Sequence, residues 1–92
     1  TGDYLEEFNI SQNYPNPFNP STKITYNIPQ RSNVSLRIYD VLGKEIATLV
    51  NEQKEAGTYN IQFDASKLSS GVYIYSIQAG DFLESRKMIL MK

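Results

Sequence analysis

Apolar and polar residues alternate in a series of short segments along most of this chain, and residues that favour turns separate these segments. A period of two places every second side chain on the same face of a β-strand. No stretch shows a helical period. The alternating segments span residues 23–28, 34–40, 45–50, 58–63, 72–78 and 82–92, and a weaker one lies at 8–12. This spacing predicts an all-β fold, a seven-stranded immunoglobulin-like β-sandwich.

The length of the chain limits it to one domain, because 92 residues can build only one hydrophobic core. Residues 1–7 are acidic and show no alternation, so we expect them to be the remnant of a linker. The domain is then expected to span residues 8–92. The chain begins at Thr1 rather than at a methionine, and we therefore expect it to be a piece of a larger protein.

The stretch from residue 45 to residue 57 combines a strand with a polar segment. Two apolar pairs within residues 45–50 indicate a β-bulge in that strand. Residues 51–57 are polar up to their final glycine, and we expect them to form a loop.

A Gly-Asp pair at residues 80–81 predicts a two-residue hairpin loop near the end of the chain. With this loop, Val72 lies opposite Ile89, and Ile74 lies opposite Lys87. The outer face of the hairpin would then be partly apolar. Such a patch either marks a contact site or is covered by a neighbouring loop.

The residues that lead into this hairpin have the spacing of a tyrosine corner, Leu68-Ser-Ser-Gly71-Val-Tyr73. In immunoglobulin-like sandwiches, the tyrosine hydroxyl at such a corner bonds to the backbone a few residues upstream. The hydroxyl of Tyr73 is therefore expected to fix the crossing from one sheet to the other.

Residues 12–22, QNYPNPFNPST, contain three prolines and two aromatic residues. Each proline restricts itself and the residue before it, so this stretch is stiff. Because it lacks three N–H donors, it can lie along a sheet edge or cross between sheets but not within a central strand. We name residues 12–20 the strap and expect Phe18 to be the buried aromatic anchor that holds it to the core. Structural roles are predicted for Tyr14, Pro15, Pro17, Phe18, Pro20, Gly57, Tyr59 and Leu68.

The composition argues against catalysis and against several classes of partner. Without cysteine or histidine, the chain lacks disulfides, thiolate chemistry, the usual zinc ligand and the usual general base. Its carboxylates fall mainly at turns and strand ends, and the clustered Asn13, Asn16 and Asn19 lack the charge of a calcium site. A net charge of −1 attracts neither nucleic acid nor anionic membrane. We expect no enzyme activity, cofactor, metal, nucleic acid or small-molecule substrate.

Four stretches together carry a family resemblance: YPNPFNPSTKITYNIP, VSLRIYDVLGKEIATLV, AGTYNIQFDASKLSSGVYIYSI and ESRKMILMK. They closely resemble the C-terminal sorting domain of the type IX (Por) secretion system, type A. The resemblance covers residues 14–92. A looser one, to the immunoglobulin-like domain of flagellar hook-cap proteins, rests on the YDVLGKEIATL stretch.

The resemblance to sorting domains implies a seven-stranded immunoglobulin-like fold and a role as a non-catalytic secretion signal. Such a domain follows an N-terminal cargo domain in the same chain. Its cargo crosses the periplasm, and the outer-membrane translocon passes that cargo to the cell surface or the exterior. A sortase-like enzyme typically removes the domain and attaches the cargo to a lipopolysaccharide. The residues implied in recognition are Gly71, Tyr73, Lys87, Met88, Ile89, Leu90, Met91 and Lys92.

Two alternatives stay open at this point. The terminal segment is also compatible with a plain core strand whose lysines are solvated. The whole domain is compatible with an accessory immunoglobulin-like spacer or a carbohydrate-binding module of a secreted enzyme, since exposed tyrosines could stack on sugar rings. The sequence contains seven tyrosines, although most fall at inward-facing positions or in the strap.

Overall fold

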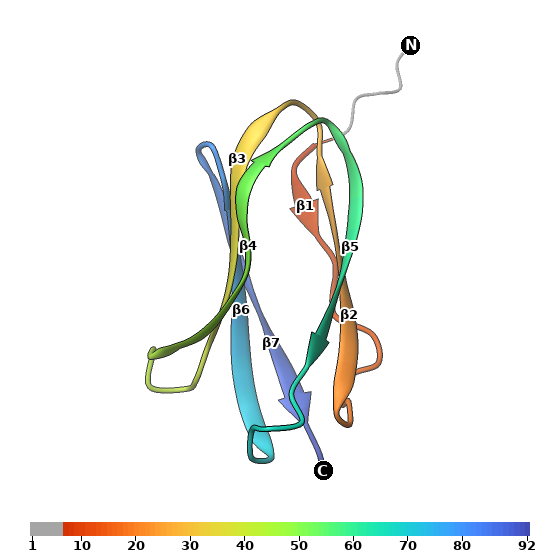
Figure 1. The fold of residues 1–92 in the computed structure, drawn as a ribbon, viewed down its shortest axis with the longest axis vertical. Helices are drawn as coiled ribbons and strands as arrows, with labels where there is room; N and C mark the ends of the chain where they lie inside the picture. Colours follow the sequence, from red (N-terminus) through yellow and green to blue (C-terminus); the bar gives the residue numbers. More distant parts are fainter. Residues whose placement is uncertain (1–6) are drawn as a thin grey trace.

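Within residues 7–92, seven strands form two antiparallel sheets that pack face to face as a sandwich (Figure 1). The structure, a computed structural model, describes residues 7–92. Of the expected linker remnant over residues 1–7, only Glu7 lies within the described residues. The described part has no helix that is long and apolar enough to cross a membrane. The strands are β1 (Asn9–Ile10), β2 (Ser21–Ile28), β3 (Ser32–Tyr39), β4 (Glu45–Lys54), β5 (Gly57–Asp64), β6 (Gly71–Ala79) and β7 (Phe82–Leu90).

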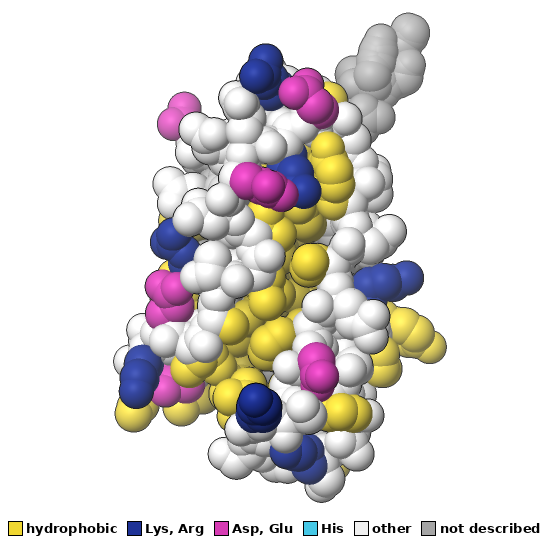
Figure 2. Space-filling model, viewed as in Figure 1, with side chains coloured by type: hydrophobic (Ala, Val, Ile, Leu, Met, Phe, Trp, Pro, Cys, Tyr) yellow, Lys and Arg dark blue, Asp and Glu magenta, His cyan; other side chains and the backbone are white. Residues whose placement is uncertain are grey.

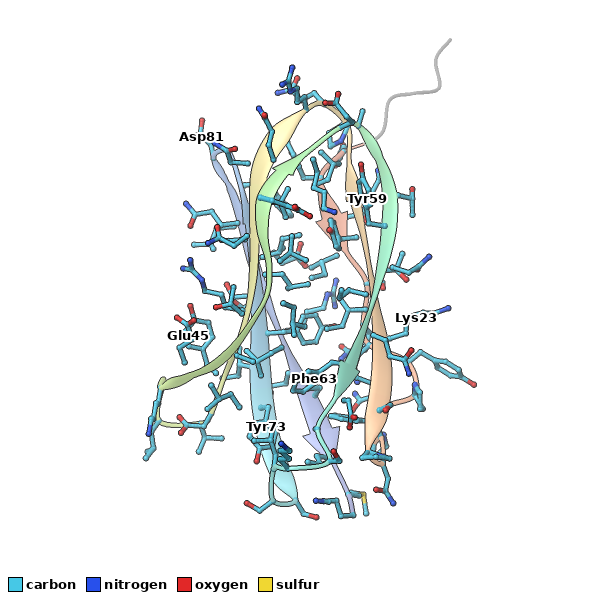
Figure 3. All side chains as sticks on the ribbon, in the orientation of Figure 1. Lys23, Glu45, Tyr59, Phe63, Tyr73 and Asp81 are labelled. Carbon is cyan, nitrogen blue, oxygen red and sulfur yellow. The ribbon has the colours of Figure 1, made fainter. Side chains whose placement is uncertain are left out.

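One sheet has the strand order β1-β2-β5, and the other has the order β4-β3-β6-β7. The core lies between them, because every second residue of strands such as β2, β3 and β6 faces inward. In β2 and β3, this places Ile24, Tyr26, Ile28, Val34, Leu36 and Ile38 in the interior. Figure 3 shows Tyr59 and Phe63 of β5 pointing into the same space, whereas Lys23 and Glu45 lie outside it. Each fully buried Ile or Leu stabilises the fold by roughly 1.5–3 kcal/mol.

The hairpin of β6 and β7 has the predicted register. Val72 lies opposite Ile89, and Ile74 lies opposite Lys87. The loop glycine, Gly80, has a φ of 60°, which residues with a side chain rarely adopt. A two-residue turn of this kind therefore aligns the end of the chain with β6.

The predicted loop over residues 51–57 is wrong, because β4 continues to Lys54 and only residues 55–56 separate it from β5. Residues 51–54 pair with β3 from Ser35 to Ser32. They carry no alternating pattern because most of them are exposed on both faces of an edge strand. A strand with no buried face leaves no period of two in the sequence.

The flank between β4 and β5 exposes part of the core, and Figure 2 shows apolar side chains along it. β4 and β5 are edge strands of different sheets. The register of β3 with β4 shifts twice, so that Ile46 and Leu49 have no partner on β3. These are bulges of the kind predicted for residues 45–50. Bulges bend an edge strand and discourage pairing with other chains.

Candidate functional site

The C-terminal end of β7 is the candidate site, because the family resemblance places recognition there. Its side chains alternate between the core and the solvent. Met88 and Leu90 are 0% and 1% exposed, whereas Ile89 and Met91 are 39% and 58% exposed. Lys87 is exposed as well. One face of this short segment therefore stabilises the core, and the other presents a lysine and two apolar side chains.

The strap crosses from one sheet to the other and closes the edge of β7. At its start, Tyr14 pairs with Lys23 of β2 through two backbone hydrogen bonds of 2.9 Å. Further along, the Phe18 N–H donates to the Ile89 carbonyl, and the Phe18 carbonyl accepts from the Met91 N–H, both at 2.9 Å. The Phe18 side chain is 2% exposed, so the prediction of a buried aromatic anchor is confirmed. The Tyr14 side chain is 77% exposed, and its contacts with the sheet are those of its backbone.

Two amide side chains of the strap extend this closure along β7. The Oδ1 atom of Asn16 accepts from the Ile89 N–H at 2.9 Å. The Nε2 atom of Gln12 donates to the Lys87 carbonyl at 2.7 Å. Both amides satisfy backbone groups on the side of β7 that faces away from β6.

Lys92 fastens the residues after β7 to the connection between β5 and β6. Its Nζ atom donates to the carbonyls of Ser66 at 2.7 Å and Leu68 at 2.9 Å. Its backbone N–H donates to the Ser70 hydroxyl at 2.9 Å. The ammonium group of Lys92 is thus engaged within the domain.

The same connection contains the tyrosine corner. The Tyr73 hydroxyl donates to the Ser69 carbonyl at 2.6 Å, which confirms the predicted corner. Leu68 packs against the core, and Gly71 lies opposite Leu90 at the beginning of β6. Tyr73 and Lys92 therefore donate hydrogen bonds to three carbonyl groups of this connection, those of Ser66, Leu68 and Ser69.

Gly57 and Tyr59, for which structural roles are predicted, belong to the beginning of β5, which lies at the opposite end of the long axis from the C-terminal end of β7 (Figure 1). The Tyr59 hydroxyl donates to the Glu55 carbonyl at 2.7 Å, and its ring stacks on Tyr26 with centroids 5.4 Å apart. These contacts hold the short connection between β4 and β5.

Tyr75 links β6 to the beginning of the strap. Its buried hydroxyl accepts from the Asn13 N–H at 2.8 Å and donates to the Ser11 carbonyl at 2.6 Å. Burial raises the pKa of Tyr75, and the bond from Asn13 and the charge of Arg86 offset part of this rise. The hydroxyl therefore stays neutral at physiological pH and can serve as both donor and acceptor.

Asn13 is a structural residue that sequence reasoning missed. It is 2% exposed, and its Nδ2 atom donates to the Thr22 hydroxyl at 3.0 Å and to the Pro15 carbonyl at 3.1 Å. The Thr22 hydroxyl donates to the same carbonyl at 2.8 Å. This network gives the turn of the strap a satisfied polar interior. The sequence shows only an asparagine among other amides, with nothing that marks it as buried.

The predicted apolar patch on the outer face of the β6–β7 hairpin is present. Val72 is 37% exposed and lies opposite Ile89, which is 39% exposed. Ile74 is half-buried beside them. The patch adjoins the exposed side chain of Lys87 and continues the exposed face of β7.

Nothing in residues 7–92 resembles a catalytic or metal centre. No group of three or more potential ligands gathers within that part of the chain. Asp40 and Asp64 accept hydrogen bonds from backbone N–H groups in turns, and Glu84 pairs with Arg86. Tyr14 is the one largely exposed tyrosine in the described range, so the row of exposed tyrosines that a sugar-binding face needs is not found there.

Comparisons with known proteins give a family match and a structural match. A family profile described as "Secretion system C-terminal sorting domain" matches residues 12–91. A solved structure of PorZ, described as an essential bacterial surface component of the type-IX secretion system of Porphyromonas gingivalis, has a TM-score of 0.61 and 19% sequence identity. That match covers 97% of this chain and 12% of PorZ, and at this identity it shows a shared fold. No curated protein matches the chain significantly.

Proposed function

Because this chain belongs to the family of secretion system C-terminal sorting domains, we propose that the folded end of β7 is what the type IX machinery recognises. The domain directs secretion by the type IX system, and its cargo reaches the cell surface or the exterior. It is a sorting signal without catalytic activity that interacts with the secretion machinery.

The exposed face of the β7 end, Lys87, Ile89 and Met91, makes the contact in this proposal. The alternation of exposure along the segment is the observation that carries it, since Ile89 and Met91 are 39% and 58% exposed while Met88 and Leu90 are buried. A lysine next to two apolar side chains suits an apolar receptor surface with an acidic group. The other family positions, Gly71, Tyr73, Met88, Leu90 and Lys92, hold this face in place.

The finer features of the type A group belong to the same proposal. Cargo attached before β1 passes from the periplasm through the outer-membrane translocon, and a sortase-like enzyme then removes the domain and attaches the cargo to a lipopolysaccharide. The shape of the domain keeps the side of the cargo linker apart from the recognised end of β7. β1 lies in the half of the molecule away from the C-terminal end of β7, and the long axis measures 44 Å (Figure 1). A cleavage enzyme could therefore reach the linker side while the translocon holds the other end.

The proposal is tested by fusing residues 1–92 to a reporter that is exported to the periplasm of a host with type IX machinery. Lys87→Glu and Met91→Asp reverse or remove the contacts of the exposed face. Each is expected to lower the secreted fraction about tenfold, which corresponds to a loss of about 1.4 kcal/mol of binding free energy. Both side chains are exposed, so the melting midpoint should change little.

Leu83→Asp is the matched control, because Leu83 is 66% exposed on the same face of β7 but near the hairpin loop. Its secreted fraction should equal that of the unmodified fusion. Normal export of the Lys87→Glu, Met91→Asp double variant contradicts the assignment of the face. A reporter that stays in the periplasm with the unmodified domain contradicts the function itself.

A further inference from the structure

β7 is an edge strand, so one side of its backbone has no neighbouring strand in the sheet. The residues that point their N–H and carbonyl groups to this free side include Lys87, Ile89 and Met91. Such groups form a template on which another chain can add a strand. The same three residues carry the exposed face of the candidate site. A partner could therefore bind either by adding a strand to their backbone or by contacting their side chains.

The strap occupies this template without being a regular strand. Phe18 supplies one backbone pair, and the amides of Gln12 and Asn16 supply the next contacts along β7. The backbone partners fix the orientation of both amides, because a carbonyl can only accept and an N–H can only donate. Gln12 must therefore present its nitrogen to Lys87, and Asn16 must present its oxygen to Ile89.

We propose that Gln12 and Asn16 are positioning residues that take the place of a neighbouring strand and keep the edge of β7 closed. The inference rests on the proposed function, which makes the end of β7 the recognised segment. With the edge closed, the machinery binds the side chains of Lys87, Ile89 and Met91 and does not add a strand to β7. The two amides also hold that face in register with the core.

The opposite chemistry of the two contacts gives a sharp test in the same reporter fusion. Asn16→Asp keeps an acceptor for the Ile89 N–H, whereas Asn16→Ala removes it. Gln12→Glu removes the donor to the Lys87 carbonyl, as Gln12→Ala does. Gln12 and Asn16 are both at the surface, so these substitutions leave the core unchanged. Loss of one hydrogen bond shifts a local equilibrium about fivefold. Secretion should fall about fivefold with Asn16→Ala, Gln12→Ala and Gln12→Glu, and it should stay normal with Asn16→Asp.

Amide hydrogen exchange of the isolated 92-residue chain gives a readout independent of secretion. The Ile89 amide should exchange about fivefold faster in Asn16→Ala and at the normal rate in Asn16→Asp. The Met88 amide, which faces β6, should be unchanged, and the melting midpoints should match so that folding does not explain a loss of export.

Three results overturn the inference. If the Ile89 amide exchanges no faster in Asn16→Ala, the contact does not close the edge. If exchange accelerates while secretion stays normal, closure of the edge is irrelevant to sorting. If secretion rises when the edge is opened, the machinery adds a strand to β7. In each case, the unmodified fusion is still secreted, whereas its retention in the periplasm counts against the proposed function.

Discussion

Replacing Phe18 with alanine tests whether the strap is held to the sandwich by its buried ring. Phe18 is 2% exposed and lies beside Phe63 of β5, with ring centroids 6.4 Å apart. The backbone bonds of Phe18 to β7 do not need the side chain and should survive the change. The loss therefore consists of the ring and the cavity that it leaves, which together cost about 3–5 kcal/mol for a buried Phe→Ala change.

For a domain of this size, 1 kcal/mol corresponds to a melting shift of about 4–8 °C. Phe18→Ala should then melt about 12 °C or more below the unmodified chain in calorimetry or circular dichroism. Such a loss is a large part of the roughly 5–15 kcal/mol that stabilises a typical domain. A decrease of less than about 4 °C would refute the argument, because the ring would then contribute no more than an ordinary surface group.

Tyr14→Ala is the matched control within the same strap. The Tyr14 ring is 77% exposed, and its backbone pairing with Lys23 does not depend on the side chain. The free energy of unfolding should change by no more than about 0.5 kcal/mol. If both variants lost the same stability, the cause would be the aromatic composition of the strap and not the burial of one ring.

Two further predictions concern the tyrosine hydroxyls. Tyr73→Phe removes the donor to the Ser69 carbonyl, so we expect the free energy of unfolding to fall by about 1 kcal/mol. In urea denaturation this loss gives a lower midpoint with an unchanged slope. An unchanged midpoint would show that the corner bond adds no stability. Burial raises the pKa of Tyr26 and of Tyr75, so the folded state keeps protons that the unfolded state loses near pH 10. The contribution of these two hydroxyls to stability should therefore be fully present below about pH 10 and be lost as the pH rises through the raised pKa values, and a shallower fall in Tyr75→Phe would identify its hydroxyl.

The positions of most strands and the β6–β7 register could be predicted because local patterns determine them. Alternation identifies a strand that has one buried face, and a two-residue Gly-Asp loop fixes which residues lie opposite one another. The tyrosine corner follows from a spacing within six residues, from Leu68 to Tyr73. Each of these features depends on neighbours in the sequence, which a single chain displays directly.

The contacts that complete the candidate site could not be predicted, because they join distant parts of the chain through groups with no distinctive pattern. The Gln12 amide reaches a carbonyl 75 residues away, and the Asn16 amide reaches an N–H 73 residues away. Many asparagines and glutamines lie at the surface without any such partner. Lys92 is similar: its sequence position suggests a solvated charge, whereas its ammonium group binds two carbonyls of the β5–β6 connection.

The alternation at the end of β7 also decides which experiments can separate recognition from folding. Deleting residues 88–92 removes Met88 and Leu90, which are 0% and 1% exposed, together with the contacts of Lys92. Truncating either buried side chain to alanine would cost about 2–5 kcal/mol, so the deletion would unfold most domains of this size. Failed secretion of the deleted form would then follow from unfolding alone. Substitutions on the exposed face leave the core intact, and a loss of secretion at an unchanged melting midpoint is an effect that a plain core strand cannot produce.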